Sequence, residues 1–461
     1  MRWRATALVI SLCLVTVACG GTAPVPHATP SRTAEPTPSQ PLGSAWPVYH
    51  HDPQRTGASP NTPAPHALGI SWRANLDGAV LAQPLDVSGN VIVATEDDSL
   101  YALRPNDGTV VWRTHVGTPV PKSDLPCGDI FPLGITGTPA YDPNRQSIFA
   151  VAEELGPEHV LYAFNAATGA VRWSRDVDIK IPSENPAAVQ QRPALAVANG
   201  YVYIGFGGLD GDCNQYRGAV VAVPTTGQGS TLQYLVPTSR EGAVWATGGP
   251  VLGPGNDIFV STGNGAATSP PWDGSDSVLD LSPNLQLISA FAPASWPSDN
   301  AADLDLGSVG PTLLPDGYLF IAGKSGVGYL LRQSALGGVG GQLFQAKVCR
   351  GAMAFGGTAF SSDSLYLPCE NGVEAISVSG AGSFSVSWQT ATTANGPPVW
   401  GGGCVWSVDT NTGVLFALDG ATGAAVAQIA VGSVPHFTSP TLVGAQAFVA
   451  TDSGVVAVSG A

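Results

Sequence analysis

The sequence predicts an all-β protein, an eight-bladed β-propeller of four-stranded antiparallel blades. Three observations predict it. Short apolar runs alternate with turns rich in Gly, Pro, Asn and Asp, one strand-and-turn pattern recurs eight times, and the last copy lacks a strand that a segment near the N-terminus can supply. With 57 Gly, 39 Pro and only 19 Lys and Arg, the composition disfavours helical repeats and favours many short strands.

The first 18 residues are predicted to be a signal peptide. Two arginines precede an apolar run at 5–18, which is 14 residues long and therefore short for a membrane span. The run ends in Ala-Cys-Gly, which resembles the processing site of bacterial lipoproteins, although Thr16 replaces the commoner leucine. This resemblance implies that Cys19 becomes the lipidated N-terminus. The alternative is an ordinary secretory signal in which Cys19 is incidental.

Residues 19–44 are predicted to be a flexible tether, which leaves 45–461 as the folded domain. The tether is rich in Pro, Thr, Ser and Ala and has almost no large apolar side chain, so it cannot form a core. We therefore expect an extracytoplasmic protein that a lipid anchors to a membrane, or a secreted protein if Cys19 is not lipidated.

The chain is acidic, with a formal net charge of −15. A surface of this sign repels phosphate groups, so nucleic acid is not an expected partner. The sequence also has no zinc-ligand spacing and no serine-nucleophile motif.

The repeat is clearest in three segments, which are LYALRPNDGTVVW at 100–112, LYAFNAATGAVRW at 161–173 and LFALDGATGAAV at 415–426. Each has an alternating apolar strand, a turn that ends in glycine, and a second strand. Alternation indicates that the two faces of the strand meet different surroundings, and glycine supplies the positive φ that the turn needs. Weaker copies bring the number of units to eight.

The ends of the chain predict how the ring of blades closes. The last copy stops at Ala461 after its third strand, and the orphan segment ISWRANL at 70–76 resembles the fourth strands of other copies. We therefore predict that 70–76 completes the eighth blade, because a closed ring leaves no unpaired inner edge.

The LYALxxxTGxxxW pattern resembles the pyrroloquinoline quinone (PQQ) repeat. Proteins with this repeat include the quinoprotein alcohol dehydrogenases, with eight blades, and an outer-membrane assembly lipoprotein, with fewer. The resemblance covers residues 70–461 and implies the fold. It does not imply an activity, because many propellers with this repeat bind no quinone.

Four long insertions interrupt the repeat, at 117–137, 207–218, 262–276 and 294–307. Each lies either between the second and third strands of a blade or between successive blades. These loops open on one rim of a propeller, which we call the long-loop rim. Loops on a rigid scaffold commonly carry function, so we expect a ligand or partner site there.

The resemblance to quinoprotein dehydrogenases implies a calcium site. In that family the Asn of a Thr-Gly-Asn motif ligates calcium, and Asn264 matches it. A glutamate near the second blade is another ligand, for which Glu153 or Glu154 is the candidate. Calcium prefers such oxygen ligands.

The same resemblance implies residues for the quinone and for catalysis. Trp245 corresponds to the tryptophan under the quinone ring, and Lys324, in AGKSG, matches the lysine that contacts the quinone. Asp303 or Asp305 corresponds to the catalytic base, which would remove the alcohol proton while calcium polarises the quinone.

One departure from that family keeps several functions open. The dehydrogenases carry two adjacent cysteines over the quinone, and this sequence has no Cys-Cys pair. We therefore expect a non-catalytic propeller that binds a small molecule or an envelope protein on its long-loop rim. The alternatives are a PQQ- and calcium-dependent dehydrogenase of alcohols or sugars, and a cell-envelope assembly scaffold.

The cysteines of the folded domain predict two disulfides. Cys127 and Cys213 both fall on the long-loop rim, in neighbouring blades, and Cys349 and Cys369 fall on the same rim, before the sixth blade and at the end of its second strand. We predict bonds within each pair, which suits an oxidising compartment. Cys404 is left over and is expected to be buried.

A His50-His51-Asp52 segment precedes the first blade. Metal binding and proton transfer are alternatives. We expect a structural plug, in which these side chains hydrogen-bond the N-terminal segment to the propeller.

Overall fold

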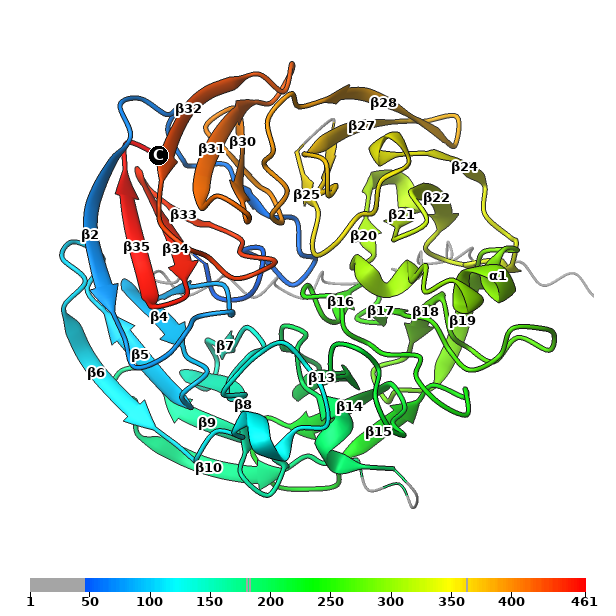
Figure 1. Cartoon of the computed structure of the whole chain (residues 1–461), viewed down its shortest axis with the longest axis horizontal. Helices are drawn as coiled ribbons and strands as arrows, with labels where there is room; N and C mark the ends of the chain where they lie inside the picture. Colours follow the sequence, from blue (N-terminus) through cyan, green and yellow to red (C-terminus); the bar gives the residue numbers. More distant parts are fainter. Residues whose placement is uncertain (1–45, 180, 182–183, 362–363) are drawn as a thin grey trace, which may run out of the picture. The chain divides into compact units, whose positions relative to one another are not determined.

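The computed structural model describes residues 46–461, apart from 180, 182–183 and 362–363. The predicted signal peptide, the predicted lipidation site Cys19 and the predicted tether lie outside the described residues. Eight antiparallel sheets surround a central axis, which confirms the predicted propeller (Figure 1). Each blade runs from an inner first strand to an outer fourth strand.

The first four blades follow the order of the chain. The first blade contains β3 (Leu85–Val87), β4 (Asn90–Ala94), β5 (Ser99–Leu103) and β6 (Val110–His115), and the second contains β7 (Ala140–Asp142), β8 (Ser147–Glu154), β9 (Glu158–Asn165) and β10 (Val171–Asp176). The third blade contains β12 (Ala196–Ala198), β13 (Tyr201–Gly208), β14 (Ala219–Pro224) and β15 (Leu232–Leu235), and β11 (Val189–Gln190) also pairs with β13. The fourth blade contains β16 (Val251–Leu252), β17 (Ile258–Thr262), β18 (Ser277–Leu281) and β19 (Leu287–Ala292), and β23 (Gly338–Val339) pairs with β19.

The other four blades complete the ring. The fifth blade contains β20 (Thr312–Leu313), β21 (Tyr318–Ala322), β22 (Val327–Arg332) and β24 (Phe344–Lys347), and the sixth contains β25 (Ala359–Phe360), β26 (Leu365–Leu367), β27 (Glu374–Ser379) and β28 (Ser383–Gln389). The seventh blade contains β29 (Val399–Gly401), β30 (Cys404–Asp409), β31 (Val414–Asp419) and β32 (Ala425–Ala430), and β1 (Ala58–Ser59) pairs with β29. The eighth blade contains β33 (Thr441–Val443), β34 (Gln446–Thr451), β35 (Gly454–Ser459) and β2 (Gly69–Asn75).

Helical structure is confined to short pieces. They are α1 (Trp296–Ala301) and the 3-10 turns Lys122–Asp124, Pro186–Ala188, Leu306–Ser308, Pro315–Gly317 and Cys349–Gly351. Within the described part of the chain, none of these helices has the length and apolar character needed to cross a membrane.

Strand β2 closes the ring as predicted. It pairs antiparallel with β35, from Gly69 opposite Ser459 to Asn75 opposite Gly454, and the blue and red strands lie side by side in Figure 1. The eighth blade therefore combines the two ends of the described chain. Because this pairing is a ladder of main-chain hydrogen bonds, it resists opening of the ring.

The Gly and Trp of the repeat meet across neighbouring blades. A methyl group added at each turn glycine would lie 2.7 Å or less from the indole of the preceding blade's fourth strand. These glycines also have positive φ, so both space and backbone require glycine. The pairs are Gly108 with Trp72, Gly169 with Trp112, Gly227 with Trp173, and Gly423 with Trp388.

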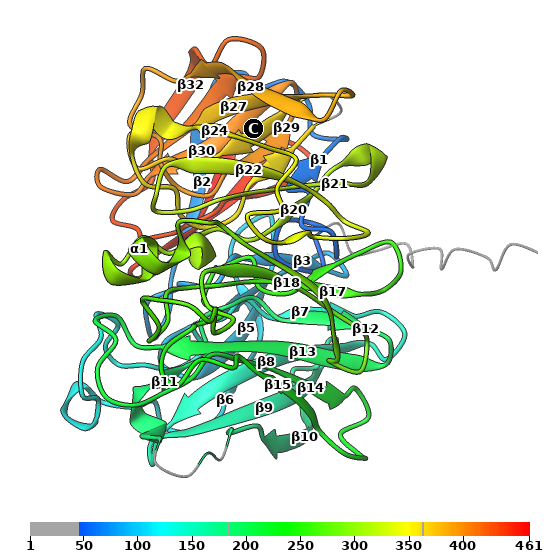
Figure 2. The same cartoon turned by 90° about the vertical axis from the view of Figure 1, so that its right-hand side faces the viewer.

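The N-terminal segment of the domain, residues 46–62, plugs the channel. At its start, Trp46 forms a β-bridge with Asp86 of β3. Near its end, β1 pairs parallel with β29. Both contacts lie next to turns between the first and second strands of a blade. These turns are on the rim opposite the long-loop rim. Figure 2 shows β1 and α1 on different sides of the ring.

Buried polar contacts hold the plug. The His50 ring contacts the main-chain O of Thr358 through Nδ1 at 2.9 Å and Ser439 Oγ through Nε2 at 3.0 Å. Arg55 donates to the main-chain O of Tyr49 at 3.0 Å and of Leu195 at 2.8 Å. The predicted plug is confirmed for His50, whereas Asp52 bonds to Thr56 within the segment and the His51 ring contacts Asp52 and Trp46.

Both predicted disulfides are present. The Cα atoms of Cys127 and Cys213 are 6.2 Å apart, and those of Cys349 and Cys369 are 5.4 Å apart. Cys404 is a buried free thiol. The first bond joins the loop before the second blade to a loop of the third, so it ties two insertions of the long-loop rim together.

Candidate ligand-binding site

The long-loop rim surrounds a pocket of about 580 Å³ at the mouth of the channel. Its lining residues come from loops of the second to the eighth blade, so seven of the eight blades take part in forming it. Such a volume falls within the range of small-molecule sites.

Three half-buried aromatic side chains form the apolar part of the pocket. The ring centroids of Trp245, Phe355 and Phe437 lie 6.4, 6.3 and 5.9 Å from one another, and the three residues come from loops before the fourth, sixth and eighth blades. These rings offer a ligand a broad apolar surface that the separate blades hold in place.

Two cations lie against this aromatic group. The Arg192 guanidinium is 4.4 Å from the centroid of Phe437, and the Lys324 ammonium is 5.7 Å from that of Trp245. Both distances permit cation–π attraction. Four exposed carboxylates complete the wall, those of Asp129, Asp210, Asp303 and Glu370.

Lys324 joins two of the predicted catalytic carboxylates. Its Nζ lies 2.9 Å from Asp303 Oδ1 and 2.5 Å from Asp305 Oδ2. Burial raises the pKa of Asp305, and the Lys324 charge opposes this effect. Burial alone would lower the pKa of Lys324, but the two carboxylates outweigh it and raise that pKa.

Asn264 reaches this group through its main chain. Its N–H donates to Asp305 Oδ1 at 2.5 Å, and its main-chain O accepts from the Gly242 N–H at 2.7 Å. Asp305 is therefore fixed from two sides, by Asn264 and by Lys324.

The two glutamates lie elsewhere, at the end of β8. Glu153 is buried, where its Oε1 accepts from the Gln191 N–H at 2.7 Å and its Oε2 lies 3.5 Å from His159 Nε2. Glu154 accepts from the Tyr162 hydroxyl at 2.5 Å. Neither glutamate lines the pocket.

The structure therefore brings together one part of the predicted site. Trp245, Asp303 and Lys324 line the pocket, and Asp305 and Asn264 lie behind them. The glutamates do not join this group.

The sequence analysis missed Arg192, Phe355 and Phe437. They lie just before the first strands of three different blades, in the segments QQRP, AFGG and HFTSP. These segments have no strand periodicity, and only closure of the ring places them together. An aromatic or basic residue just before a first strand is the one signal that could have indicated them.

The plug closes the pocket at its base. Only about 10 Å³ of space separates the pocket floor at Arg192 and Phe437 from Tyr49 and Thr247, which is room for no more than a water. Tyr49 and Thr247 are themselves joined by a 3.2 Å hydroxyl contact. A ligand must therefore enter and leave from the long-loop rim.

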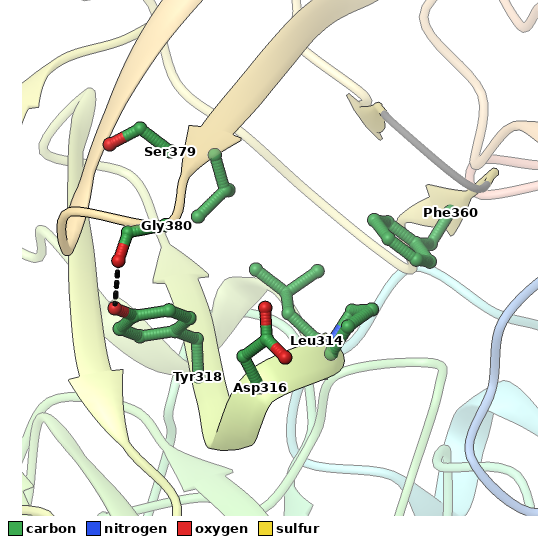
Figure 3. A pocket seen from close by; sticks show the side chains of 8 residues that line it. Leu314, Asp316, Tyr318, Phe360, Ser379 and Gly380 are labelled. Atoms are coloured by element: carbon green, nitrogen blue, oxygen red, sulfur yellow. Dashed lines mark hydrogen bonds between the residues drawn. The ribbon is translucent and has the colours of Figure 1, made fainter.

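A second pocket, of about 300 Å³, lies on the opposite rim between the fifth and sixth blades. Its wall contains Leu314, Asp316, Tyr318 and Phe360, and the Tyr318 hydroxyl donates to the Gly380 O at 3.2 Å (Figure 3). It is smaller and draws on only two blades, so it is the weaker candidate.

Solved structures with the same fold include enzymes and an assembly factor. The quinohemoprotein alcohol dehydrogenase ADHIIG from Pseudomonas putida HK5 is 15% identical, with a TM-score of 0.70 over 90% of this chain and 80% of that one. The corresponding enzyme from Comamonas testosteroni is 16% identical, with a TM-score of 0.66 over 90% and 80%. BamB from Moraxella catarrhalis is 15% identical, with a TM-score of 0.60 over 85% and 99%. At these identities the likeness shows the fold alone.

Sequence comparison gives the family. No curated protein matches this chain significantly. A family model described as outer membrane protein assembly factor BamB matches residues 69–300, which is half of the chain. Together with the repeat and the eight closed blades, this match shows that the chain belongs to the PQQ-like β-propeller family of the outer membrane protein assembly factor BamB.

Proposed function

We propose that this protein is a non-catalytic binding propeller, which receives a small molecule or a segment of an envelope protein in the pocket on its long-loop rim. The pocket itself carries this proposal. Seven blades contribute to it, three aromatic rings line it, and the plug closes its base. A cup of this kind can hold a ligand without performing chemistry on it.

The contacts of the carboxylates support a non-catalytic role. A general base must be free to accept a proton, but Asp305 is buried and bound to Lys324, and Asp303 is bound to the same ammonium. Glu153 and Glu154 have partners of their own outside the pocket. The oxygen ligands that a calcium–quinone centre would need therefore lie in separate places, which supports the non-catalytic role.

The two disulfides support an extracytoplasmic location, because such bonds persist in oxidising compartments. The proposal includes a lipid on Cys19 that keeps the domain near a membrane, within reach of envelope proteins. Metabolic labelling with a palmitate analogue tests the anchor. Label should enter the wild-type chain and not a Cys19→Ala variant.

Site-specific photo-crosslinking in cells tests the pocket. Met353 is exposed and lines the pocket, whereas Val426 is 55% exposed on the outer strand β32. A photoreactive residue at 353 should give an adduct that the matched residue at 426 does not give. Phe437→Ala should weaken the adduct at 353, because it removes one aromatic wall. Equal labelling at 353 and 426 would contradict the proposal.

The second candidate is a PQQ- and calcium-dependent dehydrogenase of alcohols or sugars. The placement of Trp245, Asp303 and Lys324 around one pocket favours it. Calorimetric titration with PQQ, with and without calcium, separates the two functions. Micromolar, calcium-dependent binding that is lost in Asn264→Ala would establish the enzyme, whereas no binding would retire it.

The third candidate is a cell-envelope assembly scaffold, for which the description of the matching family model is the support. The crosslinking experiment also tests this candidate. An adduct at 353 with a membrane protein that is itself being assembled would favour it over capture of a small molecule.

A further inference from the structure

Four carboxylates gather where the first blade meets the second, outside the lining of the pocket. Glu96 and Asp98 lie in the turn between β4 and β5, and Glu153 and Glu154 end β8. Glu96, Asp98 and Glu153 are buried, and Glu154 is half-buried. Glu153 has a cationic partner, His159, but the other three have no ion pair among the described residues.

Asp98 lacks any partner for its charge. Its side chain is fully buried, at 0% exposure, and among the described residues neither Oδ1 nor Oδ2 accepts a hydrogen bond. Only one of the two carboxylate oxygens of Glu96 has hydrogen-bond partners. Its Oε2 accepts from the Gly134 N–H at 2.8 Å and from Thr136 Oγ1 at 3.0 Å, and its Oε1 has no partner. Burying three carboxylate oxygens without a donor or a cation is costly.

The loop before the second blade brings these groups together. A methyl group at Gly134 would lie 2.8 Å from Asp98 Oδ1 and closer still to the main-chain O of Glu96. The Val116 N–H donates to the main-chain O of Asp98 at 2.9 Å, and a methyl group at the next residue, Gly117, would lie 2.7 Å from Glu154 Oε1. Asp98 therefore lies against this loop at Gly134, beside the main-chain O of Glu96, and Glu154 lies against the same loop at Gly117.

The charges in this space are of one sign. Burial, followed by the repulsion of Glu154, Glu96 and Glu153, raises the pKa of Asp98 to about 9. Burial also raises the pKa of Glu96 to about 8, against the hydrogen bonds from Gly134 and Thr136 and the Arg192 charge, which lower it. The cluster must therefore hold either extra protons or a cation at neutral pH.

We propose that this cluster binds a hard divalent cation, calcium, between the first and second blades, with Asp98 as the principal ligand and with Glu154, Glu96 and the Glu96 main-chain O beside it. All of these donors are oxygens, which calcium prefers, and its variable geometry tolerates water as the remaining ligands. The site is separate from the pocket and does not depend on the function proposed above.

Binding draws the ligands closer than they lie in this structure. Among the described residues, the sets of three metal-ligating groups that already lie within 4.8 Å of one another are elsewhere, at Asp77, Asp97 and His115 and at the disulfide cysteines with Glu374. The half-buried Glu154 side chain accepts from the Tyr162 hydroxyl through Oε1 at 2.5 Å, which leaves its Oε2 for the ion.

Thermal unfolding of the purified protein with calcium chloride or with a chelator tests the site. The wild-type midpoint should rise by about 3 °C at a calcium concentration about 100 times Kd. Asp98→Asn should abolish this rise, since Asn tolerates the positive φ of 51° at this position. In chelator, Asp98→Asn should be at least as stable as the wild type, because it removes a buried carboxyl group that has no hydrogen-bond partner and must otherwise take up a proton. If Asp98→Asn does not fold, Glu154→Gln serves for the same comparison.

Two variants separate this site from other acidic groups. Asp77→Asn disrupts the exposed group of Asp77, Asp97 and His115, and Asp303→Asn removes a carboxylate of the pocket. Both should keep the calcium response of the wild type. A response that either variant loses and Asp98→Asn keeps would overturn the proposal. So would a wild-type protein with no calorimetric calcium binding, in which case the cluster holds protons instead.

Discussion

At the scale of single residues, His50 shows how a buried polar group can act as a structural part. The Thr358 carbonyl can only accept a hydrogen bond, so Nδ1 of His50 carries the proton and Nε2 accepts from the Ser439 hydroxyl. The ring also stacks on Tyr49, with centroids 4.1 Å apart. Because both ring nitrogens are engaged inside the protein, a metal-binding or proton-transfer role is not favoured.

His50 should make the stability of this protein sensitive to acid. Burial lowers its pKa from 6.5 to about 3. The hydrogen bond to the Thr358 carbonyl opposes this shift, and the Arg55 charge lowers the pKa while the Asp52 charge raises it. The folded ring stays neutral between these values while the unfolded one takes up a proton. This contribution to stability is therefore complete above about pH 6.5 and is lost as the pH falls toward 3.

The matched variant is His50→Asn, since Asn accepts the positive φ of 52° and does not titrate. The wild type should lose about 2–3 kcal/mol more than His50→Asn between pH 7 and pH 4. Urea unfolding at the two values measures this difference. Equal losses would mean that His50 is already protonated in the folded state.

At the scale of elements, the repeat is an interlock between neighbouring blades. The outer tryptophan of one blade covers the turn glycine of the next, so the residues of the LYALxxxTGxxxW pattern are coupled across a blade interface as well as within a blade. This coupling explains why the pattern could be read from the sequence. The same two residue types recur at four of the eight blade interfaces.

Gly169 tests the interlock. Its φ is 72°, and a Cβ there would collide with the Trp112 indole, whereas Gly89 has a similar φ of 78° and nothing within 4 Å of a Cβ. Gly89→Ala should cost only the backbone strain, about 1 kcal/mol. Gly169→Ala should cost about 1–3 kcal/mol more, because the indole must move. Guanidinium unfolding of both variants gives the comparison, and equal costs would show that Trp112 moves freely.

Carboxylates at the ends of second strands, or just after them, also join neighbouring blades. Glu96 accepts from the Gly134 N–H at 2.8 Å, and Glu153 accepts from the Gln191 N–H at 2.7 Å, so each binds the loop that precedes the next blade. The sequence alone did not separate this structural role from metal binding, because an acidic residue after a strand fits both.

At the scale of the whole molecule, two N-terminal parts hold the ring closed, β2 in the eighth blade and the plug in the channel. Trp46, His50 and Arg55 of the plug are each 5% exposed or less, and they contact several blades. Removing these parts would expose the edge of β35 and open the channel.

Truncation tests this closure. A chain that begins at residue 46 should remain folded, whereas one that begins at residue 78 loses both β2 and the plug and should unfold or aggregate. Size-exclusion chromatography and circular dichroism distinguish the two outcomes. A folded, monomeric chain from residue 78 would show that the remaining blades close without either part.

The sequence by itself determined the number of blades, the closing strand, the long-loop rim and both disulfides. These features follow from a local period repeated eight times, from which the position of any loop on the ring can be worked out. The free Cys404 and the plug were also correctly expected. The sequence contains this information because alternation and turn glycines act over a few residues.

Only the tertiary structure decided the composition of the pocket. Trp245, Phe355 and Phe437 are separated by long stretches of sequence and meet because three blades direct their loops toward one axis. Likewise, Asp98 is buried without a partner because the loop at Gly117 and Gly134 packs over it. Side chains in loops obey no period, so their neighbours depend on the closed ring and not on the residues beside them.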